Sequence, residues 1–374
     1  MFLKRLYIHN YKSFYHTEIE FDKLNIFVGE NNVGKSNLID VLEFYDLASK
    51  DTLQEAVSKK GGFEKLLNYH YDEKEIILEF EFLFDKLGKH DYILKLRLRV
   101  SKNIASSAWI FYKKKKNKYD LLYIEGSRYN YSLKKETSLM LRYFKLGKEP
   151  DGSILWILKT FLAGNFFQSY YFNPNQIRKF RSNNSDEFLL NDASNLGKIL
   201  YDLKENYPVK FDIVSNSLIG TVKELDGIDV KKVFNNYLVG FYEDYKKEPI
   251  SIEDVSDGTI NLIATITALN QNTIKTLLAF EEPERHLHLK AINYLLDSFR
   301  NSDKQIITTT HSTEILKYTN LKEVIFLYRD SDGDTQAIRA DEIEGLEDKL
   351  KNLAYERYLT LDELITDGII GDFE

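Results

Sequence analysis

Cysteine is absent from this chain of 374 residues. Without thiols the chain can form neither disulfides nor thiolate metal sites, which agrees with a reducing compartment. Long hydrophobic runs are missing as well, because none approaches the ~20 residues that a membrane-spanning helix requires. The first five residues become charged before the apolar core of a signal peptide could form. We therefore expect a cytoplasmic protein with no membrane partner.

The chain also lacks a surplus of basic residues. Its 51 Lys and Arg residues stand against 58 Asp and Glu residues, for a net charge of −7. Attraction of the whole molecule to DNA is therefore not implied, and any contact with DNA must be local. The densest basic cluster, Lys113–Lys118, is expected either at a solvated hairpin tip or in a loop that contacts phosphates.

What the chain does contain is the spacing of a phosphate-binding loop from Gly29 to Asn37. A strand-like run precedes it and helical periodicity follows, although a chance match in a plain strand-turn-helix is the alternative. The two glycines let backbone N–H groups point at phosphate oxygens, and the following helix directs its positive end toward them. Lys35 is expected to reach the β- and γ-phosphates and Ser36 to coordinate Mg²⁺. The nucleotide-binding residues expected here are Gly29, Asn31, Asn32, Val33, Gly34, Lys35, Ser36 and Asn37.

Hydrophobic periodicity predicts an α/β protein. Because 43% of the residues are hydrophobic, the chain can also bury a sizeable core. A hairpin of strands at 2–9 and 16–21 comes before a strand at 24–28. The next helix is expected to bury a stripe formed by Leu38, Val41, Leu42 and Tyr45. A period of two then predicts an antiparallel layer, with strands at 75–84, 92–100, 108–112, 119–124 and 128–133.

The second half of the chain returns to helical and parallel-strand patterns. We expect a buried helix at 154–162, a strand at 166–172 and a small helical insertion at 181–247. Alternation with helices predicts a parallel sheet with strands at 276–280, 305–309 and 324–328.

Two strands of this sheet end in residues that carry chemistry. Residues 277–280 are followed by Glu281 and Glu282, which suit a Mg²⁺ ligand and a group that polarises the attacking water, or else form only a charged turn. Residues 306–310 are followed by His311, which could donate to the γ-phosphate or serve a structural role. Because the ends of parallel strands meet at one edge, we expect these side chains beside the nucleotide.

Two further segments have more than one interpretation. The tetrapeptide 256–259 precedes an amphipathic helix, with Ser256 as a candidate N-cap and Gly258 leaving the backbone open. This helix start therefore either holds a phosphate or is an ordinary cap. The segment Asp330–Asp334 has the composition of a metal site, but it lies between two strand-like runs, so a hairpin turn is favoured.

Taken together, these motifs resemble those of ABC-type ATPases of the group that includes RecF, structural-maintenance-of-chromosomes (SMC) and overcoming-lysogenization-defect (OLD) proteins. Gly29–Ser36 resembles a Walker A motif and 256–259 a divergent signature, whereas 277–282 resembles a Walker B motif with its catalytic glutamate. His311 resembles the switch histidine. Glu281–His288, which reads Glu-Glu-Pro-Glu-Arg-His-Leu-His, is similar to the OLD-like branch.

The resemblance implies a single ABC-type head, 1–374, with a central mixed sheet. Lobe I would span 1–165 and hold the phosphate loop and the antiparallel layer, and lobe II would span 166–374 and hold the helical insertion. The catalytic residues would be Glu282, His311 and Lys35. Ser36 and Glu281 would hold Mg²⁺ with a lobe-coupling glutamine, for which Gln176 is slightly preferred over Gln168.

The resemblance also implies partners. Ser256 and Gly258 would contact the ATP that a second copy holds, so we expect a homodimer or a higher even oligomer. Asp257-Gly258-Thr259 departs from the transporter signature, and Glu281 replaces the commoner aspartate. OLD nucleases carry a Toprim nuclease domain after the ATPase, whereas this sequence ends at Glu374.

We therefore expect an ATPase that controls a separately encoded effector, a nuclease, in bacterial anti-phage defence. DNA is a further candidate partner. A RecF-like DNA-repair clamp and a nucleotide-gated scaffold with little hydrolysis are the alternatives.

Overall fold

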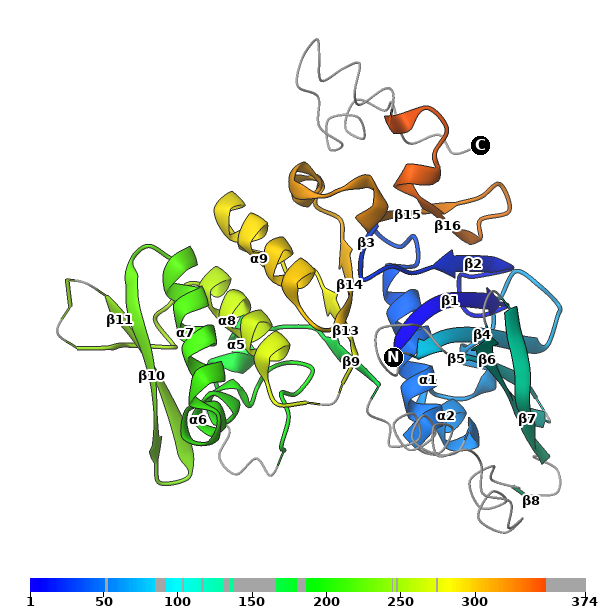
Figure 1. Cartoon of the computed structure of the whole chain (residues 1–374), viewed down its shortest axis with the longest axis horizontal. Coiled ribbons are helices and arrows are strands. Elements are labelled where there is room, and N and C mark those ends of the chain that lie inside the picture. The colour runs from blue at the N-terminus through cyan, green and yellow to red at the C-terminus, as the bar shows by residue number, and fades with distance from the viewer. Residues whose placement is uncertain are drawn as a thin grey trace.

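The computed structural model describes residues 1–50, 53–84, 92–102, 104–115, 118–130, 135–136, 166–179, 186–243, 245–246, 248–273 and 275–347. Within these ranges the strands form a seven-stranded, a six-stranded and a three-stranded sheet. The seven-stranded sheet lies at the right of Figure 1 and most of the helices lie at the left, with the six-stranded sheet between them.

The six-stranded sheet brings the predicted motif strands together. Its order is β16-β15-β3-β14-β13-β9, in which β16 is antiparallel to β15 and the other neighbours are parallel. The predicted parallel sheet is confirmed, and it takes β3 from the first half of the chain and its other strands from the second. Its strands are β3 (Leu24–Val28), β9 (Phe167–Tyr170), β13 (Leu277–Glu281), β14 (Gln305–Thr310), β15 (Val324–Arg329) and β16 (Thr335–Arg339).

The predicted antiparallel layer is confirmed as the seven-stranded sheet, in the order β2-β1-β4-β5-β6-β7-β8. The prediction of a separate strand at 128–133 is wrong, because residues 128–130 continue β7. Residues 131–133 lie outside the described residues. Gly126, between the two predicted strands, pairs with Ala108 in the β6 ladder, so the strand continues through it. The strands are β1 (Phe2–His9), β2 (Thr17–Glu20), β4 (Glu75–Phe84), β5 (Tyr92–Ser101), β6 (Ile104–Lys115), β7 (Lys118–Asn130) and β8 (Lys135–Glu136).

Helix α1 (Lys35–Lys50) packs between these two sheets, and its predicted apolar stripe is buried. The ring of Tyr45 lies 4.9 Å from that of Phe80 on β4, and the same core includes Leu277 of β13. Burial of one face against two sheets fixes the helix, and with it the loop at its start. The short helices α2 (Leu53–Lys59) and η1 (Phe63–Lys65) follow α1.

Helices cover the other face of the six-stranded sheet. They share a second core with β13, β14 and β15, and all residues of α8 except the first and the last are buried. The predicted helix at 154–162 lies outside the described residues. The helices on this side are α5 (Pro174–Ile177), α6 (Leu196–Asn206), α7 (Pro208–Thr221), α8 (Asp257–Asn270) and α9 (Leu289–Asn301), and the 3-10 helices η2 (Thr313–Tyr318) and η3 (Leu321–Glu323) lead into β15.

The prediction of a helical insertion at 181–247 is wrong for the second half of that segment. After α6 and α7 the chain forms a hairpin of β10 (Leu225–Val233) and β11 (Asn236–Glu243), to which β12 (Ile250–Ser251) adds a third strand. The apolar residues here fit a helical spacing, but the buried ones alternate along the strands, and valine favours strands. They are Leu225, Ile228, Val230, Val239 and Phe241. The tight turn requires a left-handed conformation, which Phe234 adopts with φ 52°.

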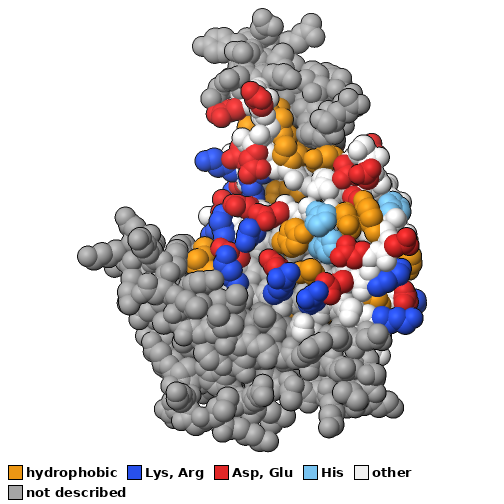
Figure 2. All heavy atoms as spheres, turned by 90° about the vertical axis from the view of Figure 1, so that its right-hand side faces the viewer, with side chains coloured by type: hydrophobic (Ala, Val, Ile, Leu, Met, Phe, Trp, Pro, Cys, Tyr) orange, Lys and Arg blue, Asp and Glu red, His pale blue; other side chains and the backbone are white. Residues whose placement is uncertain are grey.

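The outer face of the seven-stranded sheet carries charges of both signs. Cross-strand ion pairs join Arg5 to Glu18, Lys95 to Glu81 and Arg97 to Glu79 at 2.9–3.1 Å. Figure 2, which faces the right-hand side of Figure 1, shows basic and acidic side chains next to each other over the described part of the surface. On β1, β2, β4 and β5 this pairing leaves little net charge with which to attract DNA.

Lys113–Lys118 spans the turn between β6 and β7, where Lys115 pairs with Lys118, so the predicted hairpin is confirmed. Residues 116–117 at its tip lie outside the described residues. Among the helices that the structure describes, none combines the length and the apolar character needed to cross a membrane.

Candidate active site

The phosphate-binding loop connects β3 to α1, as the sequence predicts. The Lys35 ammonium folds back over the loop and donates to the carbonyl oxygens of Gly29 at 2.6 Å and Glu30 at 2.7 Å. Burial lowers the pKa of Lys35, while the negative charges of Glu282, Glu284 and Glu30 act in the opposite direction. A phosphate would supply the ammonium with a full negative partner in place of two carbonyl dipoles.

Two positions in the loop require unusual backbone geometry. Gly34 has φ 118°, and a Cβ there would lie 2.6 Å from Thr335 Oγ1 and 2.7 Å from Ser13 Oγ. Asn32 also lies in the left-handed region with φ 69°, which asparagine tolerates better than most residues. The loop is therefore shaped by its neighbours as well as by its own sequence.

Two of the side chains that support the loop come from the distant strands β15 and β16. Thr335 at the start of β16 donates from Oγ1 to the carbonyl of Val33 at 2.6 Å. Arg329 at the end of β15 donates to the carbonyls of Asn32 at 2.8 Å and Gly333 at 2.6 Å. No local pattern could have revealed them, because about 300 residues separate the two sides of each contact with the loop.

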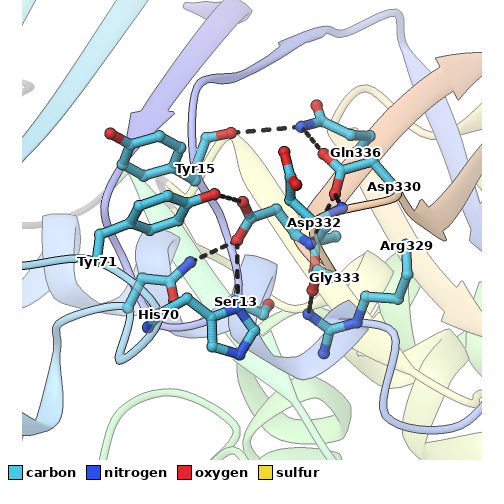
Figure 3. A network of polar contacts seen from close by, with 12 residues as sticks. Ser13, Tyr15, His70, Tyr71, Arg329, Asp330, Asp332, Gly333 and Gln336 are labelled. Carbon is cyan, nitrogen blue, oxygen red and sulfur yellow. Dashed lines mark hydrogen bonds and ion pairs between the residues drawn. The ribbon is translucent and has the colours of Figure 1, made fainter.

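Figure 3 shows the polar network around the β15–β16 turn. Asp330 accepts the backbone N–H groups of Asp332 at 3.1 Å and Asp334 at 2.9 Å, which confirms the predicted hairpin turn. Burial raises the pKa of Asp330, but hydrogen bonds from Gln336 and the turn N–H groups outweigh it and lower the pKa overall. Asp334 is 2% exposed and accepts from Asn68 and Tyr71. Within the described residues no group of three or more His, Cys, Asp or Glu is placed to hold a metal.

The two residues predicted to hold Mg²⁺ at the loop are brought together. Ser36 Oγ at the start of α1 lies 3.2 Å from Glu281 Oε2 at the end of β13. Burial raises the pKa of Glu281, the bond from Ser36 lowers it, and the charges of Glu43 and Glu282 raise it further. A divalent cation would offset that repulsion, and a hydroxyl beside a carboxylate is the oxygen donor set that Mg²⁺ prefers. These residues therefore fit the predicted metal.

The predicted catalytic pair is also in contact. Glu282 Oε1 lies 3.0 Å from His311 Nδ1, across the ends of the neighbouring strands β13 and β14. The backbone N–H of Glu282 donates to the carbonyl of Thr309 at 2.9 Å, which anchors the residue to β14. Its φ of 47° is left-handed, a strained conformation for a glutamate. A carboxylate held in this way by an imidazole can accept a proton from water.

The start of α8 confirms one expectation and corrects another. Ser256 is the N-cap, with its hydroxyl accepting from the backbone N–H of Thr259 at 3.1 Å. Gly258 does not leave the backbone open, because it is buried and a Cβ there would overlap the carbonyl oxygen of His286. The glycine is needed because the loop that follows Glu282 packs onto this helix end. A contact of Ser256 or Gly258 with ATP across a dimer remains a proposal.

The candidate lobe-coupling glutamines lie elsewhere. Gln168 Nε2 donates to the carbonyl of Ser169 at 3.2 Å and to the side chain of Asn191. Gln176 lies on α5. Arg178, the C-cap residue of this helix, reaches α8 and forms an ion pair with Asp257 at 2.6 Å. Among the described residues, neither glutamine is hydrogen-bonded to Ser36 or Glu281, so the Mg²⁺ role of Gln176 remains a prediction.

Comparisons with known proteins agree with this arrangement. The AAA_21 family model, described as "AAA domain, putative AbiEii toxin, Type IV TA system", matches residues 24–317. The chain is 25% identical over 342 residues to an ATP/GTP phosphatase of Helicobacter pylori, a match that covers 83% of this chain and 85% of that protein. It is 27% identical over 198 residues to the Old nuclease of Escherichia phage P2, which covers 49% of this chain and 32% of that protein.

A solved structure shares the fold. It is an Smc head domain with an extended coiled coil, bound to the C-terminal domain of ScpA derived from Pyrococcus furiosus. The TM-score is 0.55 with 13% identical residues, and the match covers 95% of this chain and 99% of that chain. At this identity the likeness shows the fold alone, and it confirms the predicted head with its mixed central sheet.

Proposed function

The chain belongs to the AAA_21 family and is an ABC-type P-loop ATPase of the OLD, RecF and SMC type, and from this premise we propose that it hydrolyses MgATP as a dimer that controls a separate effector. The observation that carries the proposal is the meeting of Ser36, Glu281, Glu282 and His311 at one edge of the central sheet. Three segments far apart in the sequence supply them.

Each residue has a role that follows from its place. The loop N–H groups and Lys35 bind the phosphates, and Ser36 with Glu281 holds Mg²⁺, which neutralises the developing phosphate charge when bound. Glu282 accepts the proton of the attacking water. His311 orients Glu282 through its Nδ1 contact, and we propose that its imidazole also donates to the γ-phosphate.

Dimerisation is proposed because the resemblance to the ABC-type group implies that a second copy of the chain completes the ATP site. Ser256 bonds locally to Thr259 and lies at an exposed helix start, which leaves it accessible to a second copy. In the proposed cycle ATP joins two chains, and hydrolysis releases them. ATP binding would thereby favour the dimer, and hydrolysis would favour separate chains.

The effector is proposed from the similarity to the Old nuclease. The match covers 32% of that protein, so most of the nuclease has no counterpart in the alignment. We propose that a separate protein, a nuclease, supplies the output in anti-phage defence.

The direct test compares ATP turnover and oligomeric state in four proteins. Wild type should hydrolyse ATP, Lys35→Ala should not bind it, and Glu282→Gln should bind it and accumulate as an ATP-bound dimer in light scattering. Glu205→Gln on α6 is the matched control, because it neutralises an exposed glutamate in the second lobe. Normal turnover by Glu282→Gln would contradict the catalytic assignment.

The effector is tested with the trapped protein. Glu282→Gln in the presence of ATP should retain a nuclease from native lysate that Lys35→Ala does not retain. Retention of DNA without any protein would instead favour a DNA clamp. Equal recovery with both variants would contradict ATP control.

A further inference from the structure

Glu284 is a carboxyl group buried behind the catalytic pair, and the roles proposed above do not use it. It lies in the loop between β13 and α9 and is 6% exposed. Its Oε1 bonds to the hydroxyl of Thr310, whereas Oε2 is buried and has no hydrogen-bond partner in the part of the chain that the structure describes. A buried carboxyl oxygen without a hydrogen-bond partner destabilises the folded state, so its presence calls for a functional explanation.

Thr310 connects this carboxyl to the switch histidine. It is the last residue of β14 and is fully buried, and its Oγ1 accepts the backbone N–H of Ser312 at 2.9 Å. Since Oγ1 accepts from Ser312, its own hydrogen is available for Glu284. Glu284 and Thr310 therefore fix the backbone on both sides of His311, because Thr310 precedes the histidine and Ser312 follows it.

The charged groups around Glu284 belong to the ATP site. Burial raises the pKa of Glu284 to about 7, with bonds from Thr310 and its own backbone N–H opposing the rise, Glu282 adding to it and His311 reducing it. The charge of Glu284 also acts on Lys35, whose ammonium it helps to keep protonated. Glu282 and His311 thus act on the charge of Glu284, and Glu284 acts on Lys35, and all three are residues proposed to act in catalysis.

We propose that Glu284 is a positioning residue for ATP hydrolysis, which through Thr310 holds His311 against Glu282 and holds it more firmly when ionised. The inference rests on the proposed hydrolysis at this site. An ionised carboxylate is the stronger acceptor for the Thr310 hydroxyl, because charge-assisted hydrogen bonds are stronger than neutral ones. The hydrogen bond that positions His311 through Thr310 should accordingly become stronger as pH rises through neutrality.

The test separates positioning from folding with paired variants. Thr310→Val removes the hydroxyl at nearly constant shape and should lower kcat about tenfold, the value of one lost bond of ~1.4 kcal/mol, with KM for ATP unchanged. Thr310→Ser keeps the hydroxyl and should restore kcat. Thr308→Val is the matched control on the same strand, because the Thr308 hydroxyl is buried without a hydrogen-bond partner among the described residues.

The pH profile tests the carboxyl itself. Wild-type kcat should rise a few-fold between pH 6 and 8, whereas Glu284→Gln, which cannot ionise, should stay near the low-pH value with unchanged ATP affinity. Comparing the two proteins isolates the effect of Glu284, because both contain the other ionisable groups of the site. Melting curves in the presence of ATP establish that the variants are folded.

The outcomes distinguish this inference from the proposed function. Absence of turnover in wild type, or full turnover in Glu282→Gln, overturns both. If those two proteins behave as expected but Thr310→Val matches wild type, or Glu284→Gln follows the wild-type pH profile, only the positioning role is overturned. Equal losses in Thr310→Val, Thr310→Ser and Thr308→Val would also overturn it, since they would show general damage to β14.

Discussion

Ser36 Oγ and Glu281 Oε2 lie 3.2 Å apart although 245 positions separate them in the sequence. One residue begins α1 and the other ends β13, so the contact exists only because β3 and β13 flank β14 in the same sheet. These two oxygen-bearing side chains are the residues of this chain that would hold a divalent cation.

Ser36→Ala and Glu281→Gln should each reduce the gain in ATP affinity that Mg²⁺ provides. Each removes one oxygen ligand, and we expect a loss of about tenfold, corresponding to ~1.4 kcal/mol. Calorimetric titration of ATP with and without Mg²⁺ measures the difference. Ser49→Ala, near the other end of α1, is the control and should behave as wild type, whereas a full Mg²⁺ effect in both site variants would contradict the metal assignment.

Gly258→Ala should impair hydrolysis although the residue is not itself a catalytic group. The added Cβ would overlap the carbonyl of His286, so the loop that carries Glu282 must move. Such overpacking costs about 1–3 kcal/mol, which should appear as a lower Tm together with a reduced kcat. Gly220→Ala on α7 is the control, because its Cβ meets nothing within 4 Å, and alanine should there be neutral or stabilising.

Thr335→Val should weaken ATP binding by loosening the phosphate loop. The substitution leaves the carbonyl of Val33 without the hydroxyl that it accepts at 2.6 Å. A buried bond of this kind contributes about 1–3 kcal/mol, measured as a loss of stability in urea and a rise in the Kd for ATP. Thr267→Val is the control, since that hydroxyl is buried without a hydrogen-bond partner in the described residues. Equal effects of the two changes would exclude the proposed support of the loop.

Glu284 should make stability depend on pH in a defined direction. Its pKa is raised from 4.5 to about 7, so the folded state binds the proton more tightly than the unfolded chain. The resulting stabilisation is fully present below pH 4.5 and is lost as pH rises through about 7. The free energy of unfolding of wild type should therefore fall, relative to that of Glu284→Gln, by up to about 3 kcal/mol between pH 5 and 8.

Urea unfolding of both proteins at several pH values checks this expectation. Glu205→Gln serves as the control, because an exposed glutamate on α6 should follow wild type across the range. A difference between wild type and Glu284→Gln that stays constant with pH would show that Glu284 is not the titrating group.

The sequence by itself determined the parts of the protein that depend on local chemistry. Spacing was enough to identify the loop from Gly29 to Asn37, and a side chain next to a helix start was enough to identify Ser256 as an N-cap. Periodicity placed β3 at its observed bounds and identified the buried stripe of α1. These features arise from contacts between residues a few positions apart, which the order of residues specifies directly.

Only the tertiary structure decided which distant residues meet. The hairpin at 225–243 fits a helical pattern as well as a strand pattern, and pairing with a neighbouring strand chose between them. The support of the loop by Thr335, the packing of Gly258 on His286 and the bond between Glu284 and Thr310 all join separate segments. They depend on strand order and on close packing, and a hydrophobic pattern specifies which face is buried but not what covers it.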